Sequence, residues 1–479
     1  MRLRSKLLVA GILVMTLVVA PVTTFLVVGS FDAPPFDDTD LRPERAEEVP
    51  DDQNGFPLLR EAYAAMFRLE GGKNLDGTTP EYPEDTGDDS AEKVLSDGKR
   101  LDYMVSGEKW DDAVAEDYLR RNRKALDLLD QALARPRWQL PYFDSVDAEL
   151  PYANEFLRLG ELMQLESRAQ ARRGEAAEAY GMAMKIMDFG NRLEHANNCL
   201  VTYLVGLTVR GMGTELFSDY AATCPLPPED LRAYAQRLGD MPPRGEDLAH
   251  ALRVDYLVAA NAVDQIRAHG MEKYGPGYGG PEWAFASSPY RLHPNRTKQL
   301  FADAYRVCCA AAAKPYWEAK ADIEDLAHQI EAMSDRARAD WWSLLRPNAV
   351  GEYFYFRWLP ASNNVIKTKA ITEIQLSATC LLLALRACKD EHGRPAETLQ
   401  ALVPAYLDAV PSDPFDGKPM RYDVQKRILY SVGKDGVDTG GLAREEQERW
   451  QKTDDPDAAD AGFPPRPDRM PDPSYLIEF

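Results

Sequence analysis

The chain has 479 residues, of which 45% are hydrophobic and 28% are charged, and its formal net charge is −21. This length and balance predict a folded protein of about two to three domains rather than a disordered chain. Lys and Arg are dispersed among Asp and Glu, so we predict no nucleic-acid partner, because an acidic surface repels phosphates.

The N-terminus predicts a membrane anchor. Arg2, Arg4 and Lys6 precede a stretch from Leu7 to Val28 that contains no charged residue. Such a stretch is long enough to cross a hydrocarbon core of about 30 Å, whereas a cleavable signal peptide has an apolar region of about 7–15 residues. We therefore predict an uncleaved signal anchor over residues 1–30, with a cleaved signal as the alternative. The basic flank stays inside, so the bulk of this single-pass protein is expected on the extracytoplasmic, periplasmic side.

After the anchor, residues 31–52 are rich in Asp, Glu and Pro and predict a solvated acidic linker. A helical domain is expected over residues 53–360, where apolar residues recur at helical spacing. Residues 70–92 and 270–295 are predicted to be long irregular loops. The predicted helices are Pro57–Leu69, Trp110–Ala134, Ala153–Arg172, Glu175–Arg192, Leu200–Tyr220, Pro228–Leu238, Glu246–His269 and Thr297–Met333, the last interrupted near Lys314-Pro315.

Two features of this domain predict how its helices pack. Ala153–Arg172 and Glu175–Arg192, joined at Gly174, look like one tetratricopeptide-type helical hairpin. No second copy follows at a period of about 34 residues, so a solenoid is not predicted. The aromatic run Tyr353–Trp358 is expected to pack one domain against the next, since aromatic side chains dominate core burial.

The six cysteines contain no Cys-x-x-Cys pair. We interpret most of them as small buried hydrophobic residues. An oxidising compartment permits disulfides, and a bridge between Cys199 and Cys224 is the alternative.

A repeated phrase is the strongest candidate for chemistry in the helical domain. Glu-Asp-Leu-Ala-His occurs at 246–250 and again at 324–328. In each copy both acids and the His share one helix face, and paired carboxylate–His helices form half of the dimetal site in ferritin-like bundles. We favour the simpler interpretation, a solvated helix face. The carboxylate three residues before each His is Asp in this chain, whereas the ferritin-like sites have Glu at that position. The metal ligands in this hypothesis are Asp247, His250, Asp325 and His328, with Glu155, Glu161 and Glu194 as nominal further suppliers.

A small α+β module is predicted over residues 361–441. It begins with an amphipathic helix from about Ile366, which Gly393 caps and Pro395 ends. A short second helix and an Asp-Pro turn follow. Two strands then alternate apolar and polar residues on either side of Gln425-Lys426.

The order of these elements resembles the C-terminal half of the type II secretion major pseudopilins. The matching motifs are Glu391-His392-Gly393-Arg394-Pro395, Leu399-x-x-Leu402, Pro411-x-Asp413-Pro414-Phe415-x-Gly417-Lys418-Pro419-x-x-Tyr422 and Tyr430-Ser-Val-Gly-x-Asp435-Gly436.

This resemblance implies a calcium loop after the last strand, with the Val432 carbonyl and the Asp435 carboxylate as ligands. Leu442 stands near the place of the family's later Asp ligand, so Asp438 is the expected substitute. Calcium takes six to eight oxygen ligands, which an acidic tail would help to supply. The tail carboxylates in this hypothesis are Asp455, Asp457 and Asp460.

The predicted architecture is therefore mainly α: an N-terminal transmembrane helix, a multi-helix extracytoplasmic body, a small pseudopilin-like α+β module and an acidic Pro-rich tail over 442–479. A pilin's stem helix is its own membrane anchor, whereas here the apolar span lies far upstream, so a standard pilus subunit is not expected. We expect a non-catalytic envelope protein for interaction or scaffolding, with an envelope protein as partner. The alternative is a metal-dependent enzyme that uses the carboxylate/His residues of the helical domain.

Overall fold

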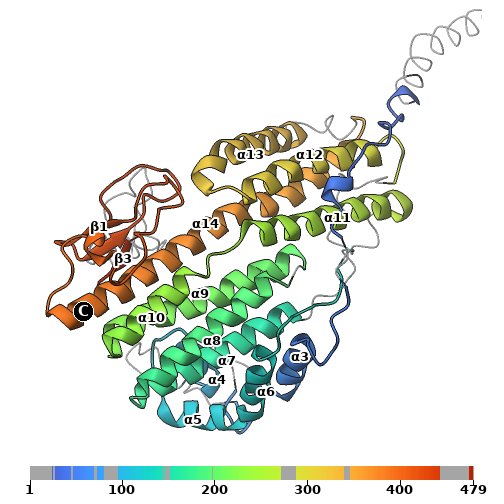
Figure 1. The fold of residues 1–479 in the computed structure, drawn as a ribbon. Helices are drawn as coiled ribbons and strands as arrows, with labels where there is room; N and C mark the ends of the chain where they lie inside the picture. The colour runs from blue at the N-terminus through green and yellow to red at the C-terminus, as the bar shows by residue number, and fades with distance from the viewer. Residues whose placement is uncertain are drawn as a thin grey trace, which may run out of the picture.

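The computed structural model confirms a mainly α-helical protein with a small antiparallel sheet near the C-terminus (Figure 1). Most of the predicted anchor, residues 1–23, 25 and 26, lies outside the part of the chain that it describes. The described residues are 24, 27–44, 47–69, 73–79, 95–143, 145, 152–196, 198–270, 287–338, 346–442, 474–477 and 479.

Twelve α-helices lie within these residues. They are α3 (Phe56–Ala65), α4 (Asp97–Val105), α5 (Asp112–Arg121), α6 (Arg123–Leu133), α7 (Tyr152–Arg172), α8 (Ala176–Glu194), α9 (Leu200–Thr223), α10 (Pro228–Gly239), α11 (Gly245–His269), α12 (Pro294–Ala312), α13 (Tyr316–Arg338) and α14 (Ala349–His392).

The helix predicted over 110–134 is two helices, because Asn122 ends the first of them. Asn122 is fully buried, and its side chain bonds the backbone of Phe67 through both amide atoms, at 2.8 and 3.1 Å. An Asn side chain that pairs with backbone groups competes with helix continuation. Helix α4 was not predicted at all, although Ser96 caps it through a hydrogen bond from the backbone N–H of Lys99.

The segment after the predicted anchor differs from the solvated linker expected over 31–52. Residues 32–41 are hydrogen-bonded to α12 and α11, and Leu41 is buried in the core. Figure 1 shows this segment at the end of the body where α11 and α12 meet.

Helix α14 is the spine of the molecule. It is 44 residues long and begins at Ala349, well before the start expected near Ile366, so the domain boundary predicted at residue 360 falls inside it. Helices α9, α10, α12 and α13 all pack against it. Among the described residues, α14 alone is long and apolar enough to cross a membrane, and 72% of its most apolar window is buried inside the protein, as in a core helix.

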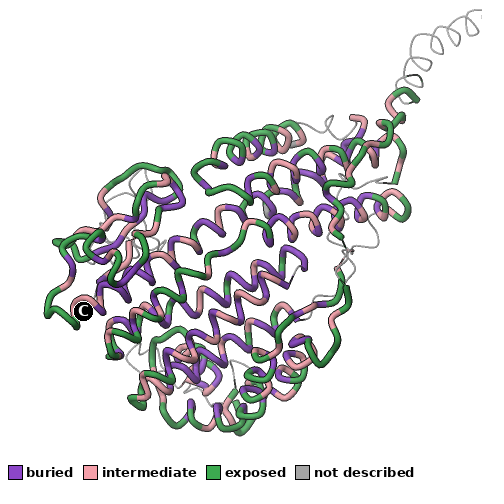
Figure 2. Tube along the Cα trace, viewed as in Figure 1, coloured by how far each residue is buried: buried purple, intermediate pink, exposed green. Residues whose placement is uncertain are grey.

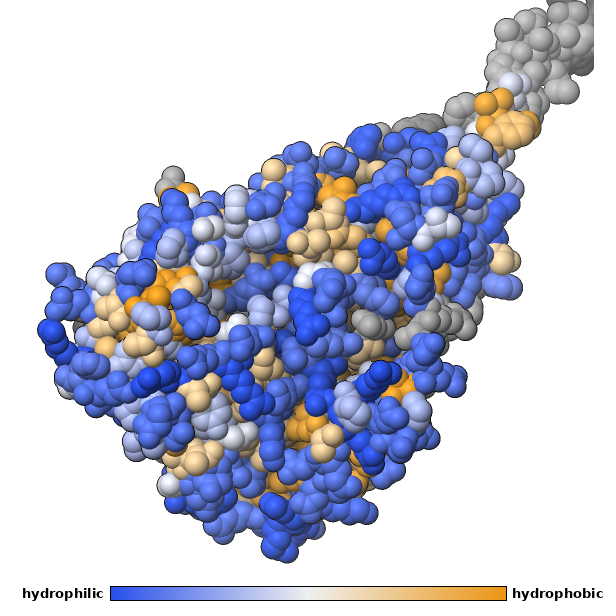
Figure 3. Space-filling model, in the orientation of Figure 1, coloured by the Kyte–Doolittle hydropathy of each residue, from blue (hydrophilic) through white to orange (hydrophobic). Residues whose placement is uncertain are grey.

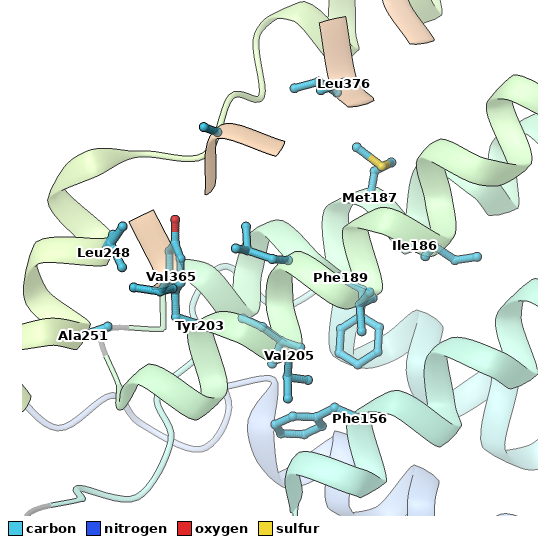
Figure 4. Close-up of a cluster of buried hydrophobic side chains, with 14 of the residues drawn as sticks. Phe156, Ile186, Met187, Phe189, Tyr203, Val205, Leu248, Ala251, Val365 and Leu376 are labelled. Atoms are coloured by element: carbon cyan, nitrogen blue, oxygen red, sulfur yellow. The ribbon is translucent and has the colours of Figure 1, made fainter. Parts of the chain in front are cut away.

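One hydrophobic core runs through the helical body. Burial alternates along each helix, with the buried side facing the neighbouring helices (Figure 2). At its centre, Phe156 of α7, Phe189 of α8 and Val205 of α9 lie close together, and Leu248 and Val365 extend the cluster to α11 and α14 (Figure 4). The outer surface is dominated by hydrophilic residues in the view of Figure 3, where hydrophobic ones form small separate patches.

The predicted hairpin is present as α7 and α8, with Gly174 in the left-handed region at the turn. Helices α8 and α9 then cross at two glycines. A Cβ on Gly190 would lie 2.6 Å from the carbonyl oxygen of Gly206, and a Cβ on Gly206 would lie 2.8 Å from that of Gly190. The two backbones therefore approach at a distance that only glycine allows.

The C-terminal module contains a three-stranded antiparallel sheet in the order β1-β2-β3. The predicted hairpin is formed by β1 (Arg421–Asp423) and β2 (Ile428–Tyr430), and Asp423 pairs with Ile428, so the connecting loop is longer than Gln425-Lys426. Strand β3 (Ser474–Leu476) comes from the predicted tail and was not foreseen.

The module docks on the start of α13. Tyr316 and Phe415 pack edge to face with their ring centroids 5.0 Å apart, and the backbone N–H of Trp317 donates to the carbonyl of Pro414 at 3.0 Å. Gly417, with φ at 72°, lies under the Trp317 ring, where a Cβ would approach to 2.9 Å. The Asp-Pro turn therefore joins the sheet to the helical body.

The glycine crossing makes the first prediction. Gly190→Ala places a Cβ against backbone atoms that cannot move aside, so we expect a loss of about 1–3 kcal/mol in the free energy of unfolding, as for overpacked cores. The matched control is Gly181→Ala on the same helix, where nothing lies within 4 Å of the new Cβ. It should be neutral or stabilising by up to about 1 kcal/mol, from helix propensity. Urea unfolding of both variants measures the contrast, and equal effects would contradict the close crossing.

Candidate functional site

A buried carboxylate organises the loop in which calcium was predicted. Asp413 is fully buried and accepts hydrogen bonds from the N–H of Phe415 (2.9 Å), the hydroxyl of Ser431 (3.0 Å) and the N–H of Val432 (2.9 Å). Arg421 adds a charged bond at 2.9 Å. A buried carboxylate is stable when its oxygens are paired in this way, so the Asp-Pro motif has a structural role.

The two acids predicted as calcium ligands are exposed. Asp435 Oδ1 accepts from the N–H of Val437 at 2.9 Å, and Asp438 Oδ2 lies 3.1 Å from Arg421 Nε. Arg421 also pairs with Asp416, where its guanidinium keeps the pKa of the carboxyl lowered despite the opposing effect of burial. In this structure Arg421 therefore supplies the positive charge that contacts the Asp438 carboxylate. Calcium binding by Val432, Asp435 and Asp438 stays a prediction, and the tail carboxylates Asp455, Asp457 and Asp460 lie outside the described residues.

The two Glu-Asp-Leu-Ala-His phrases lie on α11 and α13, on helices that both pack against α12. Asp247 is buried and His250 is half-buried, whereas Asp325 and His328 are exposed. Across the described residues, no three His, Cys, Asp or Glu side chains are arranged to hold a metal ion.

Each of the nominal glutamate suppliers has an arginine partner instead. The pairs are Glu155 with Arg60 (3.1 Å), Glu161 with Arg158 (2.8 Å) and Glu194 with Arg210 (2.7 Å).

Asp247 of the first phrase contacts a histidine that the sequence leaves isolated. Its Oδ2 lies 2.7 Å from Nδ1 of His195. His195 caps the C-terminus of α8 and Asp247 lies in the first turn of α11, so the contact joins two helix ends. His195 also lines a cavity of about 650 Å³ with Trp138 and Arg137. We take this pair as the candidate functional site.

A buried ion pair lies directly behind His195. Glu194 and Arg210 have no exposed side-chain surface, and Arg210 also donates to Asn191 Oδ1 at 3.0 Å and to the carbonyl of Met241. Burial raises the pKa of Glu194, against the lowering effects of Arg210 and His195. Glu194 Oε2 has no hydrogen-bond partner among the described atoms, so the polar cluster behind the cavity is only partly satisfied.

The contact between Asp247 and His195 is close but is not an aligned hydrogen bond. Among the described residues neither Asp247 Oδ2 nor His195 Nδ1 has a hydrogen-bond partner, although the two atoms are 2.7 Å apart. No short motif in the sequence reveals it, because α9 and α10 separate the two residues along the chain.

A second polar network links α11, α12 and α14. The Asp255 carboxylate accepts from the Tyr305 hydroxyl at 2.5 Å and the Ser362 hydroxyl at 2.7 Å, and Trp358 donates to the Tyr305 oxygen at 3.1 Å. Burial raises the pKa of Asp255, and burial beside this carboxylate raises the pKa of Tyr305 as well.

The cysteines are all free thiols. The alternative of a Cys199–Cys224 bridge is wrong, because the two residues cap opposite ends of the 24-residue helix α9 and lie roughly 36 Å apart along its axis. Burial raises the pKa of both thiols, as expected for packed side chains.

Comparisons with protein-family models, with curated proteins and with solved structures found no match to this chain. The pseudopilin resemblance therefore stays a prediction carried by the motifs of residues 366–441.

Asp255 gives a prediction of pH dependence. Its folded-state pKa lies above the ordinary value of 3.8, so between these two values the folded state binds more protons than the unfolded state. Stability should fall as pH rises through that window and be highest below it. Asp255→Asn removes this titration, so the variant should gain stability relative to wild type between pH 3.5 and pH 7.5. Urea unfolding at both pH values tests the sign, and an unchanged difference would contradict it.

The calcium loop gives a third prediction. We expect calcium to raise the melting temperature of the wild-type chain and to leave Asp435→Ala unchanged, since that variant lacks the proposed ligand. Arg421→Gln removes the guanidinium that competes for Asp438, so its calcium response should exceed that of wild type. Thermal unfolding with calcium or with a chelator measures all three chains. An equal rise in the wild type and in Asp435→Ala would eliminate the loop as a calcium site.

Proposed function

We propose that this chain is a membrane-anchored extracytoplasmic scaffold, without catalytic activity, that holds its C-terminal module at a fixed distance from the membrane. The observation that carries the proposal is a clasp, formed by residues 29–41 on helices α11 and α12. This segment directly follows the predicted transmembrane span, so a clasp here ties the body to the anchor.

The first half of the clasp holds the start of α12. Asp32 accepts hydrogen bonds from the N–H groups of Asn295 and Arg296, at 2.8 and 3.1 Å. Those groups lack partners inside the helix, and an acid at a helix N-terminus is favoured by the helix dipole. The buried His293 lies 2.9 Å from the carbonyl oxygen of Gly29 through Nε2.

The second half of the clasp uses charge. Tyr256 of α11 donates to Asp38 at 2.7 Å, and Arg306 of α12 holds Asp40 with two bonds of 2.9 Å. The bond from Arg306 keeps the pKa of the Asp40 carboxyl low, so this pair persists at neutral pH. Leu41 is buried at the end of the segment.

Hydrogen bonds connect the clasp to the start of α14. Asn348, fully buried in a left-handed conformation, accepts from the N–H of His293 at 2.8 Å and from the Thr297 hydroxyl at 2.9 Å, directly before α14 begins. From there α14 runs for 44 residues, roughly 66 Å, to the region of the sheet. This continuity supports a spacer that separates the module from the membrane.

The alternative is a metal-dependent enzyme. Asp247 is buried and contacts His195 at the edge of a cavity, which favours this alternative over a wholly solvated helix face, because metal-binding histidines commonly contact a carboxylate through their other ring nitrogen. It requires stoichiometric iron, manganese or zinc in the purified chain that is lost in His250→Ala.

The clasp makes a prediction in lipid vesicles. A fluorescent amino acid at the exposed position 424 and an acceptor lipid report the distance between module and membrane. We expect the full-length chain to partition with the vesicles and give one narrow distance distribution. Asp32→Ala combined with His293→Ala should broaden it, because the side-chain bonds of the first half of the clasp are removed.

Asp230→Asn, on the exposed side of α10, is the matched control and should behave as wild type. A chain that remains in solution, or a distribution that is already broad in wild type, would contradict the proposed scaffold.

A further inference from the structure

A cavity of about 510 Å³ lies between α13 and α14, away from the clasp and from His195. Its apolar base includes Ile330 of α13 and Phe356 of α14, both buried. This volume falls in the range of pockets that hold small organic ligands.

The walls of this cavity carry unpaired charges of both signs. Glu331 and Asp335 are one turn apart on α13 and so share a face, and Arg357 and Lys367 belong to α14. Within the described residues, these four side chains make no ion pair or side-chain hydrogen bond, with one another or with other groups. Opposite charges that face one cavity without pairing leave both an anionic and a cationic subsite.

The α14 wall also carries an unsatisfied acceptor. Asn363 lines the cavity, is 4% exposed, and its Oδ1 has no hydrogen-bond partner. Pro360, one turn before, has no N–H for the carbonyl of Phe356, which therefore lacks its usual helical donor. Buried acceptors are normally paired, so a ligand that brings N–H groups would complete this wall.

We infer that this cavity binds a short peptide with free termini. Its ammonium group pairs with Glu331 and Asp335, its backbone N–H groups reach the unsatisfied acceptors of α14, and its carboxylate pairs with Arg357 or Lys367. Arg357 and Lys367 lie roughly 15 Å apart along the helix axis, with Asn363 between them. An extended tripeptide spans about 10 Å, close to two helical turns, so its two charged ends contact different parts of the cavity wall.

Isothermal titration of the full chain with trialanine tests the inference, which does not depend on the membrane scaffold. We expect saturable binding at one site. N-acetyl-trialanine, which lacks the ammonium, and trialanine amide, which lacks the carboxylate, should each bind about tenfold more weakly or worse, since each loses a charge-assisted bond. Equal affinity for the three peptides, or no binding of trialanine, would overturn the proposal.

Variants locate the site. Glu331→Gln and Lys367→Gln should each weaken trialanine binding about tenfold, whereas Glu318→Gln, an exposed acid on the same helix outside the cavity, should not change it. Asn363→Leu removes an unpaired acceptor at similar volume, so it should weaken binding while leaving the melting temperature of the free chain equal or higher. Wild-type affinity in Asn363→Leu, or a fall in its melting temperature, would show that Asn363 serves the fold and not a ligand.

Discussion

The burial of α14 is the constraint on which the rest of the structure depends. A helix of this length and apolarity must be covered on most sides, and no single neighbour is wide enough to do so. Helices α9 and α10 cover one side, α12 and α13 cover another, and the C-terminal module packs beside its far end. Helices α3 to α8 do not take part in this cover: α7 and α8 pack against α9, and the shorter helices before them pack against α7 and α8 or against one another.

The buried polar groups mark the places where this packing costs desolvation free energy. The Glu194–Arg210 pair sits where α8 and α9 approach through glycine, and a fully buried pair offsets its desolvation only when its geometry is good. The pair therefore contributes less to stability than to register: sliding α9 by one turn would leave both charges buried without partners. The network around Asp255 has the same effect on α11, α12 and α14.

Helix periodicity predicted most of the fold, because each helix of the body buries one stripe against neighbours that are close in the sequence. The α7–α8 hairpin and the interruption between α12 and α13 were readable for that reason. The start of α14 could not be predicted in this way. Pro360 and the aromatic run before it favour a helix break, but the helix continues through both because its side chains are buried against neighbouring helices. The contact at the candidate site was not predicted: the sequence places Asp247 near His250, whereas the fold brings His195 to Asp247 across the two intervening helices α9 and α10. Strand β3 and the clasp depend on equally distant pairings, which no local pattern encodes.

The length of α14 has a mechanical consequence. Because other helices pack along α14, the helix and the body around it rotate together as one lever, and a rotation of about 5° at the clasp would move a point roughly 66 Å away by about 6 Å. That displacement exceeds the spacing between adjacent β-strands, so a small reorientation at one end becomes a change of contact partners at the other. Helix α14 is least stiff at Pro360, where one backbone hydrogen bond is missing. The side chains packed around that turn therefore limit how far α14 can bend.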